Sequence, residues 1–164
     1  MEIVTYPEEV LRRKAEPIDE IDEEVRALAD RMTEVMFKEE GVGLAAPQVG
    51  VGKRLIVVNL EEDFHILVNP ELVERSDGEE SAEEGCLSVP GPEAPVSRSK
   101  KVVVRGKDLD GNEVELTREG LAARVFQHEI DHINGKLFID HLSEVERSVT
   151  LREYRKLQAE GEEE

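Results

Sequence analysis

The 164-residue sequence contains one cysteine, no long apolar run and few positive charges. With Cys86 as the single cysteine, an internal disulfide is excluded. The longest run of strongly apolar residues is Leu55–Val58, far shorter than the roughly 20 residues that a transmembrane helix needs. The first residues lack the cationic start and apolar stretch of a signal peptide. We therefore expect a soluble cytoplasmic protein.

The deficit of positive charge also limits the partners of the chain. Lysine and arginine number 21 against 39 aspartates and glutamates, so the formal net charge is −18. Such a charge repels phosphate backbones and anionic lipids, which argues against general nucleic-acid or membrane binding. The apolar residues are nevertheless periodic, so the chain is predicted to fold, and its length is that of one domain.

The apolar pattern predicts an α+β fold, in which short antiparallel strands pack around a central helix and a C-terminal helix follows. Apolar residues at helical spacing predict a first helix over 19–40, capped by Asp19 or Asp22 and stopped at Gly41. Strands are expected at 55–58, 66–68, 102–104 and 114–116. The last two are joined by a hairpin turn at Asp110-Gly111.

Two more helices are expected in the last third of the chain. The second covers about 118–134, with Thr117 as its cap and Gly135 at its end. A capping box of Ser143 and Glu146 begins the C-terminal helix. We expect residues 1–159 to form the single domain and residues 160–164 to form a solvated, frayed acidic tail.

The clearest chemical motif lies on the second predicted helix, where residues 128–132 read His-Glu-Ile-Asp-His. Positions four apart on a helix differ by only about 40° around its axis, so His128 and His132 project from one face. Two imidazoles so placed can bind one metal ion. Glu129 lies on the shoulder of that face, where a carboxylate can take a proton from water and return it to a leaving amine. The alternative is two histidines that are merely packed or exposed.

A catalytic metal site needs a third protein ligand if one position stays open for water. Gly135 fits one class of zinc peptidases, but Phe138 occupies the position of that class's third histidine. His141 lies three residues too late, and Glu144 is a loose candidate. Cys86 is the other candidate, since a thiolate is a strong ligand for borderline or soft metals. The motif alone leaves open a zinc peptidase and a closed structural metal site.

Three segments of the chain resemble the signature motifs of bacterial peptide deformylases, in order and interval as well as in sequence. They are Gly41-Val42-Gly43-Leu44-Ala45-Ala46-Pro47-Gln48, Glu84-Gly85-Cys86-Leu87-Ser88 and Gln127-His128-Glu129-Ile130-Asp131-His132. Tyr6-Pro7 with Val10-Leu11-Arg12 resembles the N-terminal segment of the family, so the likeness covers all but the acidic tail. It implies removal of the formyl group from nascent formylmethionyl peptides, with release of formate.

The resemblance implies three metal ligands, which are Cys86, His128 and His132, with water as the fourth. Glu129 would be the general base, and then the acid, when the metal-bound water attacks the formyl carbon. The Gln48 side-chain amide and the Leu87 backbone N–H would stabilise the oxyanion. The resemblance suggests Fe²⁺ as the physiological ion, with Zn²⁺, Ni²⁺ or Co²⁺ able to replace it.

The resemblance also implies substrate-binding residues, which are Val42, Gly43, Leu44, Arg98 and Val125. Residues 42–44 would pair with an extended peptide, and Gly43 would let the peptide backbone approach closely because it has no Cβ. The methionine side chain would occupy an apolar pocket near Val42, Leu44 and Val125. Arg98 would lie near the peptide backbone.

Several other residues have less definite roles. Asp131 either orients a ligand imidazole or makes a structural ion pair, and Arg124 is either solvent-facing or paired with an acid. His65 is expected to be structural. Residues 89–95 contain three prolines and a glycine, so the rim beside Cys86 is expected to have an unusual shape. The preference for substrate residues beyond formylmethionine therefore stays open. Four cationic residues of the last helix are candidates for a weak, transient ribosome contact; they are Arg147, Arg152, Arg155 and Lys156.

Overall fold

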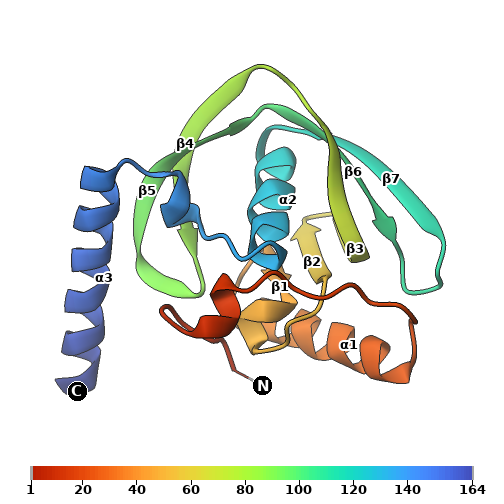
Figure 1. Ribbon diagram of the computed structural model, residues 1–164, viewed down its shortest axis with the longest axis horizontal. Helices are drawn as coiled ribbons and strands as arrows, with labels where there is room; N and C mark the ends of the chain where they lie inside the picture. Colours follow the sequence, from red (N-terminus) through yellow and green to blue (C-terminus); the bar gives the residue numbers. More distant parts are fainter. Residues whose placement is uncertain (1, 164) are drawn as a thin grey trace.

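The strands form two antiparallel sheets that arch over one central helix, α2, in the computed structural model, which describes residues 2–163 (Figure 1). The larger sheet has the strand order β1-β2-β3-β6-β7, and β4 pairs with β5 as a separate hairpin. The strands are β1 (Gly43–Ala45), β2 (Leu55–Leu60), β3 (Asp63–Arg75), β4 (Glu79–Cys86), β5 (Val89–Ser99), β6 (Lys101–Lys107) and β7 (Glu113–Glu119). The helices are α1 (Glu23–Lys38), α2 (Gly120–Ile133) and α3 (Glu144–Glu163), with 3₁₀ turns at Glu9–Arg12, Ala46–Val49 and Phe138–His141. The predicted α+β class is confirmed.

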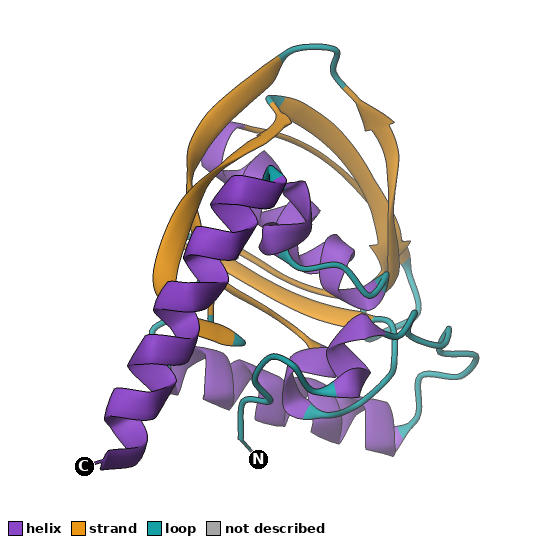
Figure 2. Ribbon diagram, turned by 60° about the vertical axis from the view of Figure 1, so that its left-hand side comes forward, coloured by secondary structure: helices purple, strands orange, loops and turns teal. Residues whose placement is uncertain are grey.

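Strand β2 is buried on both faces, which explains why its sequence is a continuous apolar run. Ile56 and Val58 pack in the same cluster as Phe126 and Ile130 of α2. The alternate residues Leu55 and Val57 pack with α1. Because successive side chains of a strand point to opposite faces, α1 and α2 cover the two sides of the sheet (Figure 2).

Helix α1 is shorter than the predicted 19–40, since it runs from Glu23 to Lys38, but it begins at one of the two predicted caps. Asp22 caps the helix by accepting a hydrogen bond from the backbone N–H of Val25 at 3.0 Å. The left-handed residue after the helix is Glu40, with φ 56°, so the predicted left-handed stop at Gly41 is wrong. Gly41 instead lies against Leu87, since a Cβ added to Gly41 would be 3.2 Å from that side chain.

Helix α2 begins later than predicted, because β7 continues through Glu119. Thr117 pairs with Val103 inside the β6–β7 hairpin and does not cap the helix, so that prediction is wrong. Gly120, with φ 61°, makes the turn from strand to helix. The predicted end of the helix is confirmed, since Gly135 follows the last turn with φ 77°.

Helix α3 begins with the predicted capping box. The N–H of Ser143 donates to Glu146, and the N–H of Glu146 donates to the Ser143 hydroxyl, each at 3.2 Å. The helix continues through Glu163, so residues 160–163 of the predicted acidic tail prolong α3; Glu164 lies outside the described residues. None of the described helices is long and apolar enough to span a membrane.

The sequence analysis missed β1, β4 and β5. Strand β1 has only three residues, and β4 reads Glu-Glu-Ser-Ala-Glu-Glu-Gly-Cys, with little β propensity. Strand β5 contains the prolines of 89–95. A two-stranded sheet has free edges on both strands, so a proline, which has no N–H, can be accommodated there. Both strands of this hairpin owe their place to tertiary packing rather than to local preference.

We predict that Gly135→Ala destabilises the fold more than Gly111→Ala. Both glycines have positive φ, 77° and 84°, so each substitution should cost about 1 kcal/mol of backbone strain. At Gly135 a Cβ would also lie 2.6 Å from the carbonyl oxygen of Arg12, whereas at Gly111 it would meet nothing. The total loss at Gly135 should reach about 2–4 kcal/mol of unfolding free energy in urea titrations. Equal losses of unfolding free energy in the two variants would show that the backbone at Arg12 moves away from the new Cβ without cost.

Candidate active site

Three potential metal ligands converge on one point below the β4–β5 turn. The donor atoms of Cys86, His128 and His132 lie within 4.8 Å of one another. The two Nε2 atoms of the histidines are 3.1 Å apart, and the sulfur of Cys86 is 3.4 Å from Nε2 of His132. Cys86 arrives at this point because it pairs with Val89 across a two-residue hairpin turn, while the histidines come from one face of α2.

This spacing fits a single four-coordinate metal ion. With typical metal–nitrogen and metal–sulfur bond lengths, tetrahedral ligands place two nitrogens about 3.3 Å apart and a nitrogen and a sulfur about 3.6 Å apart. The observed distances are 3.1 and 3.4 Å. Burial, together with the neighbouring His128, lowers the pKa of His132 well below its ordinary value, which favours the neutral imidazole that binds metals. One thiolate and two imidazoles suit Fe²⁺ or Zn²⁺.

The alternative third ligands are not brought to this point. His141 lies instead against Asp131, with Nε2 2.8 Å from the carboxylate. Among the described residues, neither His141 nor Glu144 belongs to a group of three potential metal ligands. Cys86 is therefore the third ligand candidate that the fold supports.

A buried carboxylate, Glu84, orients one of the two imidazoles. Its Oε1 is 2.9 Å from Nδ1 of His128. The other ring nitrogen of His128, Nε2, therefore points to His132 and Cys86. Arg98 donates two hydrogen bonds of 2.9 Å to the same carboxylate, and Arg124 donates a third. Burial opposes ionisation of Glu84, but the hydrogen bonds from His128 and Arg98 hold its pKa well below the usual range. Nδ1 of His132 has no hydrogen-bond partner among the described residues.

The structure places Arg98 away from the pocket, contrary to the expectation that it contacts substrate. Its side chain is only 4% exposed and is held between Glu84 and Asp131, the latter at 2.6 Å. Asp131 thus makes the structural ion pair that was one of its two predicted roles, and Arg124 is paired with an acid. Sequence reasoning had no signal for Glu84 as the partner of His128, because the two are 44 residues apart.

Glu129 lies in a tight, buried position beside the ligand cluster. Glu129 is 5% exposed, and its Oε1 has no hydrogen-bond partner among the described residues. Burial raises the pKa of Glu129 to about 7. A Cβ added to Gly43 would lie 2.6 Å from Oε2 of Glu129, so the glycine makes room for this carboxylate. We expected the peptide backbone to approach Gly43 closely, but the group that lies against Gly43 is the side chain of Glu129.

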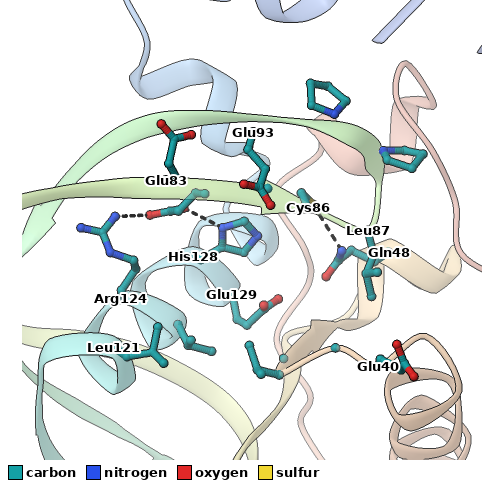
Figure 3. Close-up of a pocket in the computed structure, with 18 of the residues that line it drawn as sticks. Glu40, Gln48, Glu83, Cys86, Leu87, Glu93, Leu121, Arg124, His128 and Glu129 are labelled. Atoms are coloured by element: carbon teal, nitrogen blue, oxygen red, sulfur yellow. Dashed lines mark hydrogen bonds and ion pairs between the residues drawn. The ribbon is translucent and has the colours of Figure 1, made fainter. Parts of the chain in front are cut away.

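The side-chain amide of Gln48 is held in one orientation. Its oxygen accepts a hydrogen bond from the backbone N–H of Ala45 at 3.0 Å. The nitrogen consequently faces Ser88, at 3.3 Å, and the sulfur of Cys86, at 3.6 Å. Gln48 and Leu87 both line the pocket, as Figure 3 shows.

A pocket of about 540 Å³ opens in front of these groups. The predicted substrate residues Val42, Gly43 and Val125 line it, whereas Leu44 is fully buried behind them and does not. Leu121, which the sequence analysis did not single out, adds an apolar wall and is 63% exposed. Strand β1 is the edge of the larger sheet, so one side of Gly43–Ala45 is not paired with a strand of that sheet.

Comparison with known proteins identifies one family. The model of the family described as "Polypeptide deformylase" matches residues 1–148. The chain belongs to the peptide deformylase family. A peptide deformylase of Acidobacterium capsulatum is 47% identical over 98% of this chain and 96% of its own length. The crystal structure of the Legionella pneumophila peptide deformylase has a TM-score of 0.94 at 43% identity, covering 99% of this chain and 98% of that one.

A second solved relative is the peptide deformylase of Synechococcus elongatus in complex with actinonin, with a TM-score of 0.89 at 39% identity. The match covers 94% of this chain and 85% of that one. Peptide deformylases are hydrolases that remove N-formyl groups from nascent peptides, and the chain is an enzyme of this class. The family is one of metalloenzymes, which accords with the Cys-His-His cluster.

We predict that Glu84→Gln weakens metal binding about 10- to 100-fold, because His128 loses its charged partner. Affinity is measured by competition with a chelator and by metal analysis. Glu83→Gln is the matched control, since this adjacent carboxylate is exposed and makes no ion pair among the described residues. Cys86→Ala, which removes a candidate ligand, should abolish metal binding. Unchanged affinity in Glu84→Gln would contradict the orienting role.

Proposed function

We propose that this chain is a metal-dependent deformylase that hydrolyses the N-formyl group of formylmethionyl nascent peptides in the cytoplasm, with Glu129 as general base. The observation that carries the proposal is the convergence of Cys86, His128 and His132 beside Glu129, whose buried Oε1 has no hydrogen-bond partner among the described residues. A divalent ion held by these ligands, Fe²⁺ in our proposal with Zn²⁺, Ni²⁺ or Co²⁺ as replacements, would polarise the formyl carbonyl and lower the pKa of a water.

The surroundings of Glu129 support its proposed role as the group that moves protons. Its Oε1 is buried and free of hydrogen-bond partners among the described residues, so it can accept a proton from the attacking water. The same carboxyl group then returns a proton to the amine that leaves as the carbon–nitrogen bond breaks. Gly43 keeps it aligned, because the space that a side chain would occupy holds the carboxylate.

Gln48 and Leu87 are the proposed donors to the oxyanion. Negative charge develops on the formyl oxygen as the carbon becomes tetrahedral, and fixed donors stabilise this charge without reorganising. The Gln48 amide is already fixed by Ala45, which turns its nitrogen towards Cys86. The backbone N–H of Leu87, next to the ligand Cys86, would supply the second hydrogen bond.

The peptide itself would add to the free edge of β1, through Val42 and Gly43, as an extended strand. The methionine side chain would then contact the apolar wall formed by Val42, Leu121 and Val125. We expect any ribosome contact through α3 to be weak. Arg152, Arg155 and Lys156 are exposed there, but Nε of Arg147 is buried, and the net charge of −18 repels RNA.

The direct test is formate release from a formyl-Met tripeptide by metal-loaded enzyme. We predict that Glu129→Gln lowers kcat about 10²–10⁴-fold while the metal content stays that of the parent. The control is metal analysis of both proteins, which separates loss of the base from loss of the ion. Absence of formate release by the parent enzyme would refute the proposed function, and full activity of Glu129→Gln would refute the base.

We predict that Gly43→Ala lowers kcat at least about tenfold, because the new Cβ displaces the Glu129 carboxylate. Gly52→Ala is the control, since a Cβ there meets nothing within 4 Å. Steady-state kinetics with the same tripeptide measure both variants. If the two alanine variants are equally active, Gly43 does not position Glu129.

A further inference from the structure

The fold holds His141, a residue with metal-ligand chemistry, against the outer side of α2. His141 ends the 3₁₀ turn Phe138–His141, whose first two residues are buried. Asp140 fixes this turn, because its Oδ2 accepts a hydrogen bond from the backbone N–H of Leu137 at 2.9 Å. The imidazole of His141 is thereby brought to Asp131, with Nε2 2.8 Å from Oδ2.

An uninterrupted series of hydrogen bonds leads from His141 to the candidate metal site. Since a carboxylate only accepts, Nε2 of His141 donates to Oδ2 of Asp131, and Nη1 of Arg98 donates to the same oxygen at 2.6 Å. Nε and Nη2 of Arg98 donate to the two carboxylate oxygens of Glu84, each at 2.9 Å. Oε1 of Glu84 is 2.9 Å from Nδ1 of His128. Asp131, Arg98 and Glu84 thus connect His141 to a candidate metal ligand.

One end of this series is at the surface and the rest is inside the protein. The side chain of His141 is 34% exposed, whereas those of Arg98 and Glu84 are 4% and 6% exposed. The pocket-lining residues in the described part of the chain do not include His141 or Asp131. A substitution of His141 therefore leaves the lining of the pocket intact.

The buried part of the series is rigid enough to transmit a displacement. The pair of Arg98 and Glu84 is planar and held by two hydrogen bonds, and buried charges must keep their bonds satisfied. Among the described residues, the carboxylate of Asp131 accepts hydrogen bonds from His141 and Arg98 alone. Without His141, Asp131 depends on Arg98, so a shift of this carboxylate moves the guanidinium and with it Glu84.

We propose that His141 is a positioning residue for the candidate metal centre, which it supports through Asp131. The bond to Asp131 fixes Arg98, and Arg98 fixes the carboxylate of Glu84 that orients His128. This inference rests on the proposed metal-dependent function and adds to it a residue at the surface that tunes metal affinity. His141 acts in this way without contacting the metal or the substrate.

The test measures Co²⁺ binding by His141→Ala, through competition with a chelator and through the ligand-field absorption bands of the bound ion. The affinity should fall about 3- to 10-fold, less than for loss of a direct partner of a ligand, and the bands should shift as the His128 ring turns. His141→Gln should restore most of the affinity, because its side-chain amide can donate to Asp131 as the imidazole does.

His65→Ala is the matched control, because His65 belongs to a similar cluster on β3 and β7 rather than on the β4–β5 hairpin and α2. Its Nε2 is 2.8 Å from Asp63, and Nε of Arg118 donates to the same carboxylate at 2.8 Å. The side chain of His65 is 24% exposed, close to the value for His141. This variant should keep the Co²⁺ affinity and the absorption bands of the parent.

Parent affinity and parent absorption bands in His141→Ala would overturn the proposal, as would a loss that His141→Gln does not restore. An equal loss in His65→Ala would also overturn it, since the effect would then follow from removing any ion-paired histidine.

The double variant His141→Ala/Glu84→Gln tests the path of the effect. It should bind Co²⁺ no more weakly than Glu84→Gln alone, because both changes break the same series of hydrogen bonds. Additive losses would overturn the path through Glu84. Failure of the parent protein to bind Co²⁺ would refute the proposed metal-dependent function instead, so the two failures are distinguishable.

Discussion

The carboxylate of Glu84 is the interaction on which the site depends. It is buried and accepts hydrogen bonds from Arg98, Arg124 and His128, so one group joins β4, β5 and α2. A buried anion is tolerated only when its bonds are satisfied, and two guanidinium groups and an imidazole meet that condition here. The same bonds set the direction of one imidazole of the candidate metal site. The geometry of this candidate site and the docking of the hairpin are therefore coupled.

The β4–β5 hairpin shows why such a polar anchor is needed. The outer part of β4 is exposed and acidic, and offers little apolar surface to bury. The apolar contacts of the hairpin come from β5, whose Val89, Ala94 and Val96 pack against the 3₁₀ turn at Phe138–His141 and against α3. The ion network holds the other side of the hairpin on α2. Cys86 reaches the histidines because both sides are fixed.

The sequence predicted those parts of the candidate site whose residues lie close together in the chain. His128 and His132 are one helical turn apart, so their shared face follows from helix geometry alone. The role of Cys86 required the resemblance to a family, since nothing in the spacing relates it to α2. The acidic partner of His128 was missed because an exposed and a buried glutamate look alike in sequence, as Glu83 and Glu84 do. Likewise, nothing in the sequence indicated that Arg98 is buried between Glu84 and Asp131.

The sequence by itself determined the three helices, the apolar strand β2 and the pair of histidines on one face of α2, because each depends on contacts within a few residues or on apolar periodicity. Only the tertiary structure decided that polar residues 79–86 and proline-rich residues 89–99 form a hairpin. It alone placed Glu129 in the space that Gly43 leaves, and His141 against Asp131. These placements depend on contacts between residues far apart in the chain, and such contacts leave no periodic trace in the sequence.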